Sequence, residues 1–263
     1  MSITERRFRI SQPAQGQATF PRSGEWLNNS VFSYAGTELT ALVQAQNYYR
    51  WILSQFRPYV GPRTIEVGAG IGTFSQLLLA RTAIEQLIVV EPARNLFLQL
   101  QQRLSGNPRV TLVHGHLEDL PAPVSADSAI LINVLEHVAN VASLLAAVRA
   151  RLATDGRLLL LVPAGPRLYG SLDEALGHYR RYTKSLLGQS LVEAGFGVRV
   201  LHYLNFPGVL TWFAAGRIFR RKTLHAREVV LYDRLVIPWI SRLEARWAPP
   251  YGQSLIAVAE RAS

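Results

Sequence analysis

Short apolar runs rich in β-branched residues alternate with stretches of helical periodicity through the middle of the chain. The runs fall at residues 63–67, 86–90, 110–113, 128–133 and 157–162, and helical stretches at residues 74–80, 94–104 and 141–152 separate most of them. Strands that alternate with helices are typical of a parallel sheet covered on both faces. The chain is therefore predicted to be an α/β protein with a doubly wound, mostly parallel sheet.

Further elements are expected on both sides of this alternation. A helical pattern covers residues 40–56, and a helix at 183–194 precedes strands at 197–203 and 254–259, which brings the predicted sheet to seven strands. We divide the chain into a partly flexible N-terminal arm, a core with N-terminal helices, and an insertion between the last two strands. Their bounds are residues 1–38 for the arm, 39–204 and 251–263 for the core, and 205–250 for the insertion.

The chain contains no cysteine, which excludes disulfides, thiolate nucleophiles and cysteine-ligated metal sites. No metal site is predicted. The N-terminal residues are polar and charged and do not resemble a secretory signal. The longest uncharged apolar run near the C-terminus, residues 205–216, is too short to span a bilayer. We therefore expect a soluble, cytoplasmic protein without a transmembrane segment.

The formal net charge is +10, which is compatible with binding to nucleic acid or to an anionic surface. Lysine occurs only at Lys184 and Lys222, so nearly all of the positive charge is arginine. The predicted insertion at residues 205–250 carries eight basic residues and three acidic ones, mixed with aromatic residues. Arginines and aromatics together can stack nucleic-acid bases, wall a pocket for an apolar anion, or form a subunit interface. We favour the pocket or the interface.

Three glycines at alternate positions, Gly68, Gly70 and Gly72, lie between the first predicted strand and the following helix. Glycine lets the backbone approach a ligand closely, and the next helix offers its N-terminal amides there. A dinucleotide fingerprint would place its third glycine at position 73, where Thr73 lies, so a nucleoside without pyrophosphate fits better. Glu91, at the end of the second strand, is placed to accept ribose hydroxyls. A tight strand-to-helix turn without a ligand is the alternative reading.

Over residues 48–259 the sequence resembles the class I S-adenosylmethionine-dependent methyltransferases. The resemblance rests on "IEVGAGIG", "VVEP", "GHLEDLP", "INVLEHV" and "VRARLATDGRLLLLVP", in the order in which that family carries its motifs. It implies a Rossmann-like methyltransferase fold, methyltransferase activity and S-adenosylmethionine as cofactor. It implies almost nothing about the acceptor.

The resemblance also implies a set of cofactor-binding residues. Glu66 and the glycine backbone would hold the methionine part of the cofactor, and Glu91 the ribose. The complete set is Glu66, Gly68, Ala69, Gly70, Gly72, Glu91, Pro92, Leu117, Glu118, Asn133, Val134 and His137.

Within this set, Leu117 and Glu118 would border the adenine. His116 departs from the family pattern, because many relatives have an aspartate there that bonds the adenine amino group. Residues 133–137 would line the floor between cofactor and acceptor. The alternative for Glu136 and His137 is that they only cap the next helix.

The stretch "SLDEALGHYRRYTKSLL", residues 171–187, follows the fifth predicted strand on the side where the acceptor would bind. We take His178, Tyr179 and Arg181 as candidate catalytic residues, since imidazole titrates near neutral pH and arginine binds carboxylate or phosphate through paired hydrogen bonds. In the alternative reading, His178 and Arg181 fasten this loop to the body through Asp173 and Glu174.

The function that the sequence favours is methyl transfer to an oxygen, nitrogen or electron-rich carbon of a small molecule, either anionic, with a phosphate or carboxylate, or lipid-like. A nucleic-acid methyltransferase and a non-catalytic cofactor-binding protein are the alternatives. "NVLEH" stands where base-directed amino methyltransferases have Asn/Asp-Pro-Pro-aromatic, so nucleic acid is the less favoured partner. The insertion is expected to form an acceptor pocket, a lid or a homodimer contact.

Overall fold

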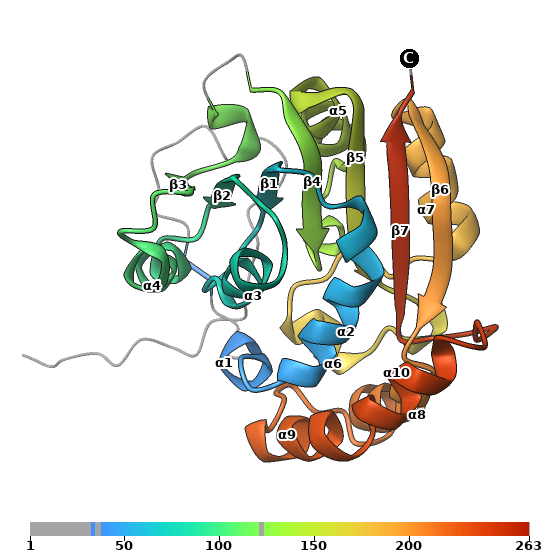
Figure 1. Cartoon of the computed structure of the whole chain (residues 1–263). Coiled ribbons are helices and arrows are strands. Elements are labelled where there is room, and N and C mark those ends of the chain that lie inside the picture. The colour runs from blue at the N-terminus through green and yellow to red at the C-terminus, as the bar shows by residue number, and fades with distance from the viewer. Residues whose placement is uncertain (1–32, 35–37, 121–123, 263) are drawn as a thin grey trace, which may run out of the picture.

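The computed structural model describes residues 33–34, 38–120 and 124–262 (Figure 1). The predicted flexible arm, residues 1–38, lies almost wholly outside the described residues. The described part of the chain forms one seven-stranded sheet in the order β3-β2-β1-β4-β5-β7-β6, in which β7 alone runs antiparallel to its neighbours. This confirms the predicted fold class. The strands are β1 (Arg63–Val67), β2 (Gln86–Glu91), β3 (Val110–His114), β4 (Ala126–Ile132), β5 (Leu152–Pro163), β6 (Phe196–Leu204) and β7 (Ser254–Arg261).

Helices cover both faces of the sheet, and further helices lie beyond one end of its strands (Figure 1). Short 3-10 turns at residues 57–59, 117–119, 135–137 and 166–168, and a π-turn at 214–218, complete the described secondary structure. The helices are α1 (Glu38–Leu42), α2 (Gln46–Phe56), α3 (Thr73–Arg81), α4 (Arg94–Leu104), α5 (Val141–Arg151), α6 (Ser171–Ala175), α7 (Lys184–Glu193), α8 (Phe206–Phe213), α9 (Ala226–Leu235) and α10 (Ile237–Glu244).

The continuous apolar run in β5 reflects burial on both faces. Alternate residues of the run 158–162 belong to the core cluster that contains α5 and α7 and to the cluster that contains α2 and α3. Because side chains alternate between the faces of a strand, a central strand covered twice must be apolar at every position. The same reasoning accounts for β7, in which residues 254–259 are all buried.

The single helix predicted at residues 40–56 is wrong, since the chain forms two helices with a break at residues 43–45. The carboxylate of Asp233, on α9, accepts hydrogen bonds from the N–H groups of Asn47 (3.1 Å) and Tyr48 (2.8 Å). A carboxylate at a helix N-terminus satisfies backbone donors that have no partner within the helix. The break therefore depends on a residue far away in the sequence.

Strand order reverses at β1, with β2 on one side and β4 on the other. In open α/β sheets, ligands bind beyond the carboxyl ends of the strands at such a switch point. The insertion between β6 and β7 folds into α8, α9 and α10. These helices lie beyond the carboxyl ends of the parallel strands, and α9 packs against α1 (Figure 1). None of the helices in the described residues is long and apolar enough to cross a membrane.

Candidate functional site

The turn between β1 and α3 holds its glycines in left-handed backbone conformations. Gly68 has a φ of 69° and Gly70 a φ of 58°, values that side-chain-bearing residues rarely adopt. Space is limited as well, because a Cβ on Gly68 would lie 2.7 Å from a methyl carbon of Val134. The turn therefore brings bare backbone against the loop that follows β4.

A cavity of about 610 Å³ opens between this turn, the loops after β2, β3 and β4, and α1. Its size lies in the range of small-molecule sites. All residues that the sequence assigned to the cofactor line it, except Gly72. The sequence did not point to other parts of its wall, which come from Tyr34, Leu39, Leu42, Tyr49, Phe74, Leu96 and residues 138–140.

Gly72 has a packing role in this structure. It precedes α3 and does not line the cavity. A Cβ at this position would lie 2.7 Å from a methyl carbon of Leu100 on α4. The close approach of two helices accounts for this glycine without a ligand.

Glu91 connects the end of β2 to the glycine turn. Its Oε2 accepts the N–H of Gly70 at 2.7 Å, and its Oε1 accepts the N–H of Ala93 at 2.8 Å. Burial raises the pKa of Glu91 to about 7, although both N–H bonds act to lower it. Each carboxylate oxygen retains a second acceptor position. Glu91 therefore fixes the turn and still offers acceptors to a ligand in the cavity.

Glu66 is a buried carboxyl group on the cavity wall. Its Oε2 has no hydrogen-bond partner among the described residues. Burial raises the pKa of Glu66 to about 8, so the carboxyl group is mainly protonated at neutral pH while the cavity holds no cation. A positively charged group beside it would reverse this preference.

The loop after β3 contributes residues 115–119 to the cavity, including the predicted Leu117 and Glu118. Asp119 also lines the cavity, and its Oδ2 accepts the N–H of His116 at 2.6 Å. The carboxylate that the sequence lacks at position 116 is therefore present three residues later, where it caps its own turn.

The segment 178–182 is fastened to the turn that follows β4. Three of its residues donate hydrogen bonds to main-chain carbonyls of residues 135–139. These bonds run from the N–H of Tyr179 to Glu136 (2.7 Å), from the guanidinium of Arg180 to Ala139 (3.0 Å), and from the hydroxyl of Tyr182 to Leu135 (3.2 Å). The unusual "HYRRY" sequence thus joins two loops at the carboxyl edge of the sheet.

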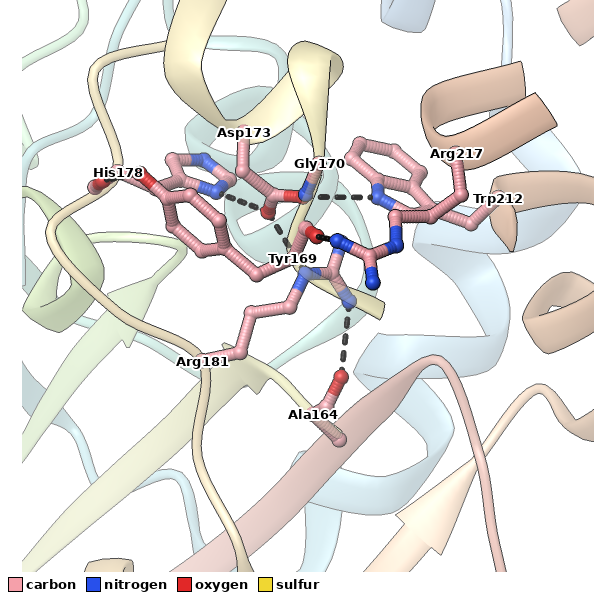
Figure 2. Close-up of polar contacts among 8 residues, drawn as sticks. All are labelled: Ala164, Tyr169, Gly170, Asp173, His178, Arg181, Trp212 and Arg217. Atoms are coloured by element: carbon pink, nitrogen blue, oxygen red, sulfur yellow. Dashed lines mark hydrogen bonds and ion pairs between the residues drawn. The ribbon is translucent and has the colours of Figure 1, made fainter. Parts of the chain in front are cut away.

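Asp173 is the centre of a buried polar network (Figure 2). Its Oδ1 accepts hydrogen bonds from His178 Nδ1 at 2.8 Å and from Arg181 Nε at 2.7 Å. Its Oδ2 accepts the indole N–H of Trp212 and the N–H of Gly170, each at 3.1 Å. Burial acts to raise the pKa of Asp173, but these donors and the Arg181 charge hold it below its ordinary value. The carboxylate is therefore ionised and fully paired.

The three candidate catalytic residues do not line the cavity. Arg181 is 3% exposed and pairs with Asp173, as the structural alternative predicted. Its guanidinium also lies 4.7 Å from the centroid of the Trp212 ring. Glu174 has no such ion pair among the described residues. Tyr179 is 42% exposed. His178 is buried, and its ring centroid lies 4.8 Å from that of His137, which does line the cavity.

The alternative role of Glu136 and His137 as helix caps is wrong. The side chain of Asn140 caps α5 instead, accepting the N–H of Ser143 at 3.1 Å. Glu136 is fully buried, and burial raises its pKa to about 8. Burial and the neighbouring His178 lower the pKa of His137 to about 3, so its imidazole is neutral. No local sequence pattern indicates that these side chains lie close to His178, which comes from a different loop.

A family model for a methyltransferase domain matches residues 65–158, the segment that contains the glycine turn, Glu91 and the turn after β4. The curated proteins include no match to this sequence.

Similar solved structures share the fold over most of the chain. A possible histamine N-methyltransferase of Thermotoga maritima is 16% identical, with a TM-score of 0.57 over 85% of this chain and 94% of that one. Phosphoethanolamine N-methyltransferase 2 of Haemonchus contortus, bound to S-adenosylmethionine, is 17% identical, with a TM-score of 0.56 over 86% and 58%. Magnesium protoporphyrin IX methyltransferase of Synechocystis, also with bound S-adenosylmethionine, is 15% identical, with a TM-score of 0.50 over 85% and 81%.

Proposed function

We propose that this chain is a class I S-adenosylmethionine-dependent methyltransferase and that it methylates a small molecule that carries an anionic group on an apolar body. The cofactor of this class supplies a methyl group already activated by its sulfonium. Orientation of the acceptor can therefore supply much of the rate, with a general base needed only where the acceptor atom must lose a proton.

The residues of the cavity fit this cofactor. The buried carboxyl oxygen of Glu66, which lacks a partner in the described chain, matches the ammonium group of the methionine part. The remaining acceptor positions of Glu91 match ribose hydroxyls, and Leu117 and Val134 offer apolar wall to the adenine.

The proposal for the acceptor class rests on the exposed surface of the insertion. The insertion exposes many large apolar side chains and also carries arginines. Its helices lie beyond the carboxyl ends of the parallel strands (Figure 1). Helix α9 packs on α1, and Leu39 and Leu42 of α1 line the cavity. We take these exposed apolar side chains as part of a binding site, and an anionic amphiphile would complement both them and the arginines. The exposed large apolar residues of the insertion are Phe206, Leu210, Phe213, Ile218, Phe219, Leu231, Leu235, Trp239, Leu243 and Trp247.

A labelled-methyl screen tests the acceptor class. The wild-type chain and cofactor are offered long-chain carboxylates and phosphates, their neutral and short-chain analogues, and RNA. We expect label in the anionic long-chain compounds, and a KM for them that rises at least about tenfold, roughly 1.4 kcal/mol, when Leu235 and Trp239 are both replaced by serine. Val192→Ser, which removes an exposed apolar side chain from α7, is the matched control. Label in RNA alone, or equal KM values in the double variant and the control, would contradict the proposal.

Cofactor binding at pH 7 is expected to release protons. The carboxyl group of Glu66, with a pKa of about 8, is mainly protonated in the folded chain, and the cofactor's ammonium group would stabilise its ionised form. Affinity should therefore rise between pH 6 and pH 8, by up to about tenfold per pH unit. Calorimetry in buffers of different ionisation enthalpy measures the protons released. The release should be smaller in Glu66→Gln, and equal release in both chains would assign the protons to another group.

Homodimer formation and the cellular location of the chain stay predictions. The exposed apolar surface of the insertion is the face through which a homodimer would form, and sedimentation of the wild type beside the Leu235→Ser/Trp239→Ser chain would detect it. We also propose a cytoplasmic location, with which a chain lacking cysteine is compatible.

A further inference from the structure

We propose that Glu136, His137 and His178 form a binding site for one divalent transition-metal ion at the wall of the cavity. One ligand atom from each residue can be chosen so that all three lie within 4.8 Å of one another. Ligand atoms at about 2.1 Å from one ion lie at most about 4.2 Å apart, so a small side-chain rotation closes the site. The main chain that carries these residues is already joined by the bond between Tyr179 N–H and the Glu136 carbonyl.

The buried carboxyl group of Glu136, which lacks a partner among the described residues, indicates that a cation binds here. Its side chain is fully buried, and neither carboxyl oxygen has a hydrogen-bond partner within the described part of the chain. A buried carboxyl group without partners is costly, and such groups pair with a charge, bind a metal or take up a proton. A bound ion would satisfy both oxygens of Glu136.

His178 is oriented as a metal ligand. Its Nδ1 is bound to Asp173 Oδ1 at 2.8 Å, so its Nε2 is the nitrogen left for a ligand (Figure 2). A carboxylate behind a metal-binding histidine fixes the ring and raises the basicity of the other nitrogen. Asp173 is itself held by Trp212 and Gly170, which makes this support rigid.

The arginine network does not compete for Glu136. Arg181 directs its Nε to Asp173 and its Nη1 to the carbonyl of Ala164, at 2.7 and 2.8 Å. It forms no ion pair with Glu136 within 4.0 Å among the described residues. Arg181 is thus paired with Asp173 and occupies neither oxygen of Glu136, which leaves both oxygens open to a cation.

His137 places the site at the cavity. Its ring packs against that of His178 with centroids 4.8 Å apart, and it lines the cavity wall. Three protein ligands leave at least one coordination position for water or for an oxygen of the bound molecule. Two imidazoles and one carboxylate suit Zn²⁺, Fe²⁺, Co²⁺ or Ni²⁺ better than Mg²⁺ or Ca²⁺. The sequence predicted no metal site, because His178 lies in a different loop from Glu136 and His137 and only the fold brings the three residues together.

The test is metal binding by the full-length chain without an affinity tag, after removal of metals with a chelator. Co²⁺, whose visible absorption reports its coordination, and Zn²⁺ are titrated, with Mg²⁺ for comparison. We expect one Co²⁺ or Zn²⁺ per chain, and an affinity at least about tenfold lower in Glu136→Gln and in His178→Gln. His225→Gln and Glu193→Gln, with exposed side chains elsewhere, are the matched controls.

Melting curves recorded in chelator show whether each variant folds, and His137→Gln supplies a third ligand change if one of the others does not. Absence of stoichiometric Co²⁺ and Zn²⁺ binding in the folded wild type would overturn the proposal. Equal affinity in the ligand variants and the controls would overturn it as well. Because no acceptor is needed, this outcome is separate from that of the acceptor screen.

Discussion

Replacement of Asp173 by alanine is expected to destabilise the folded chain by about 3–5 kcal/mol. The carboxylate is fully buried and accepts from four donors, and its removal leaves the guanidinium of Arg181 buried without its ion-pair partner. Removal of one partner of a buried ion pair costs this much because the other charge stays desolvated. Urea unfolding followed by circular dichroism measures the change in the free energy of unfolding.

A double-mutant cycle distinguishes this mechanism from a general packing defect. Arg181→Met in the Asp173→Ala background removes the unpaired charge and should restore part of the lost stability. Asp155→Ala, which removes an exposed aspartate, should stay within about 0.5 kcal/mol of the wild type. An Asp173→Ala chain within about 1 kcal/mol of the wild type would show that solvent reaches Arg181, and the network would then not hold the loops together.

Much of the sheet could be predicted because its signals are local. The run in β5 is apolar at every position since both faces of the strand are covered, and a run of this kind is visible in the sequence. The break between α1 and α2 could not be predicted, because Asp233 caps α2 from the opposite end of the chain. Long-range capping of this kind has no local pattern.

The same difference between local and long-range signals applies to the residues of the candidate site. The glycine turn and Glu91 lie close together in sequence, so their spacing predicted that they would share a cavity. The sequence placed His178 and Arg181 near the acceptor from their position after the fifth predicted strand and from their residue types. In the structure both side chains bind Asp173, and Arg181 also lies over the ring of Trp212. The position of a polar side chain depends on partners that the fold supplies, which residue type does not reveal.

Replacement of Gly70 by valine is expected to weaken S-adenosylmethionine binding at least about hundredfold, which corresponds to about 2.7 kcal/mol. Gly70 lines the cavity with a φ of 58°, and its N–H is the donor that holds Glu91. A Cβ there would lie 3.4 Å from a methyl carbon of Leu39, which is ordinary contact, so the β-carbon alone fits. The two further methyl groups of valine would occupy space that the ligand needs.

Comparison with Gly106→Val distinguishes occlusion of the cofactor site from backbone strain. Gly106 also has a left-handed φ, 82°, but a Cβ there would meet nothing within 4 Å and the residue does not line the cavity. Both valine variants therefore carry a similar backbone cost, about 1–2 kcal/mol, which should appear as a similar loss of melting temperature. Only Gly70→Val should lose cofactor affinity in calorimetry, and Gly70→Ala should fall between it and the wild type. Equal loss in both valine variants would mean that strain spreads through the fold, and the cofactor would then not lie against this turn.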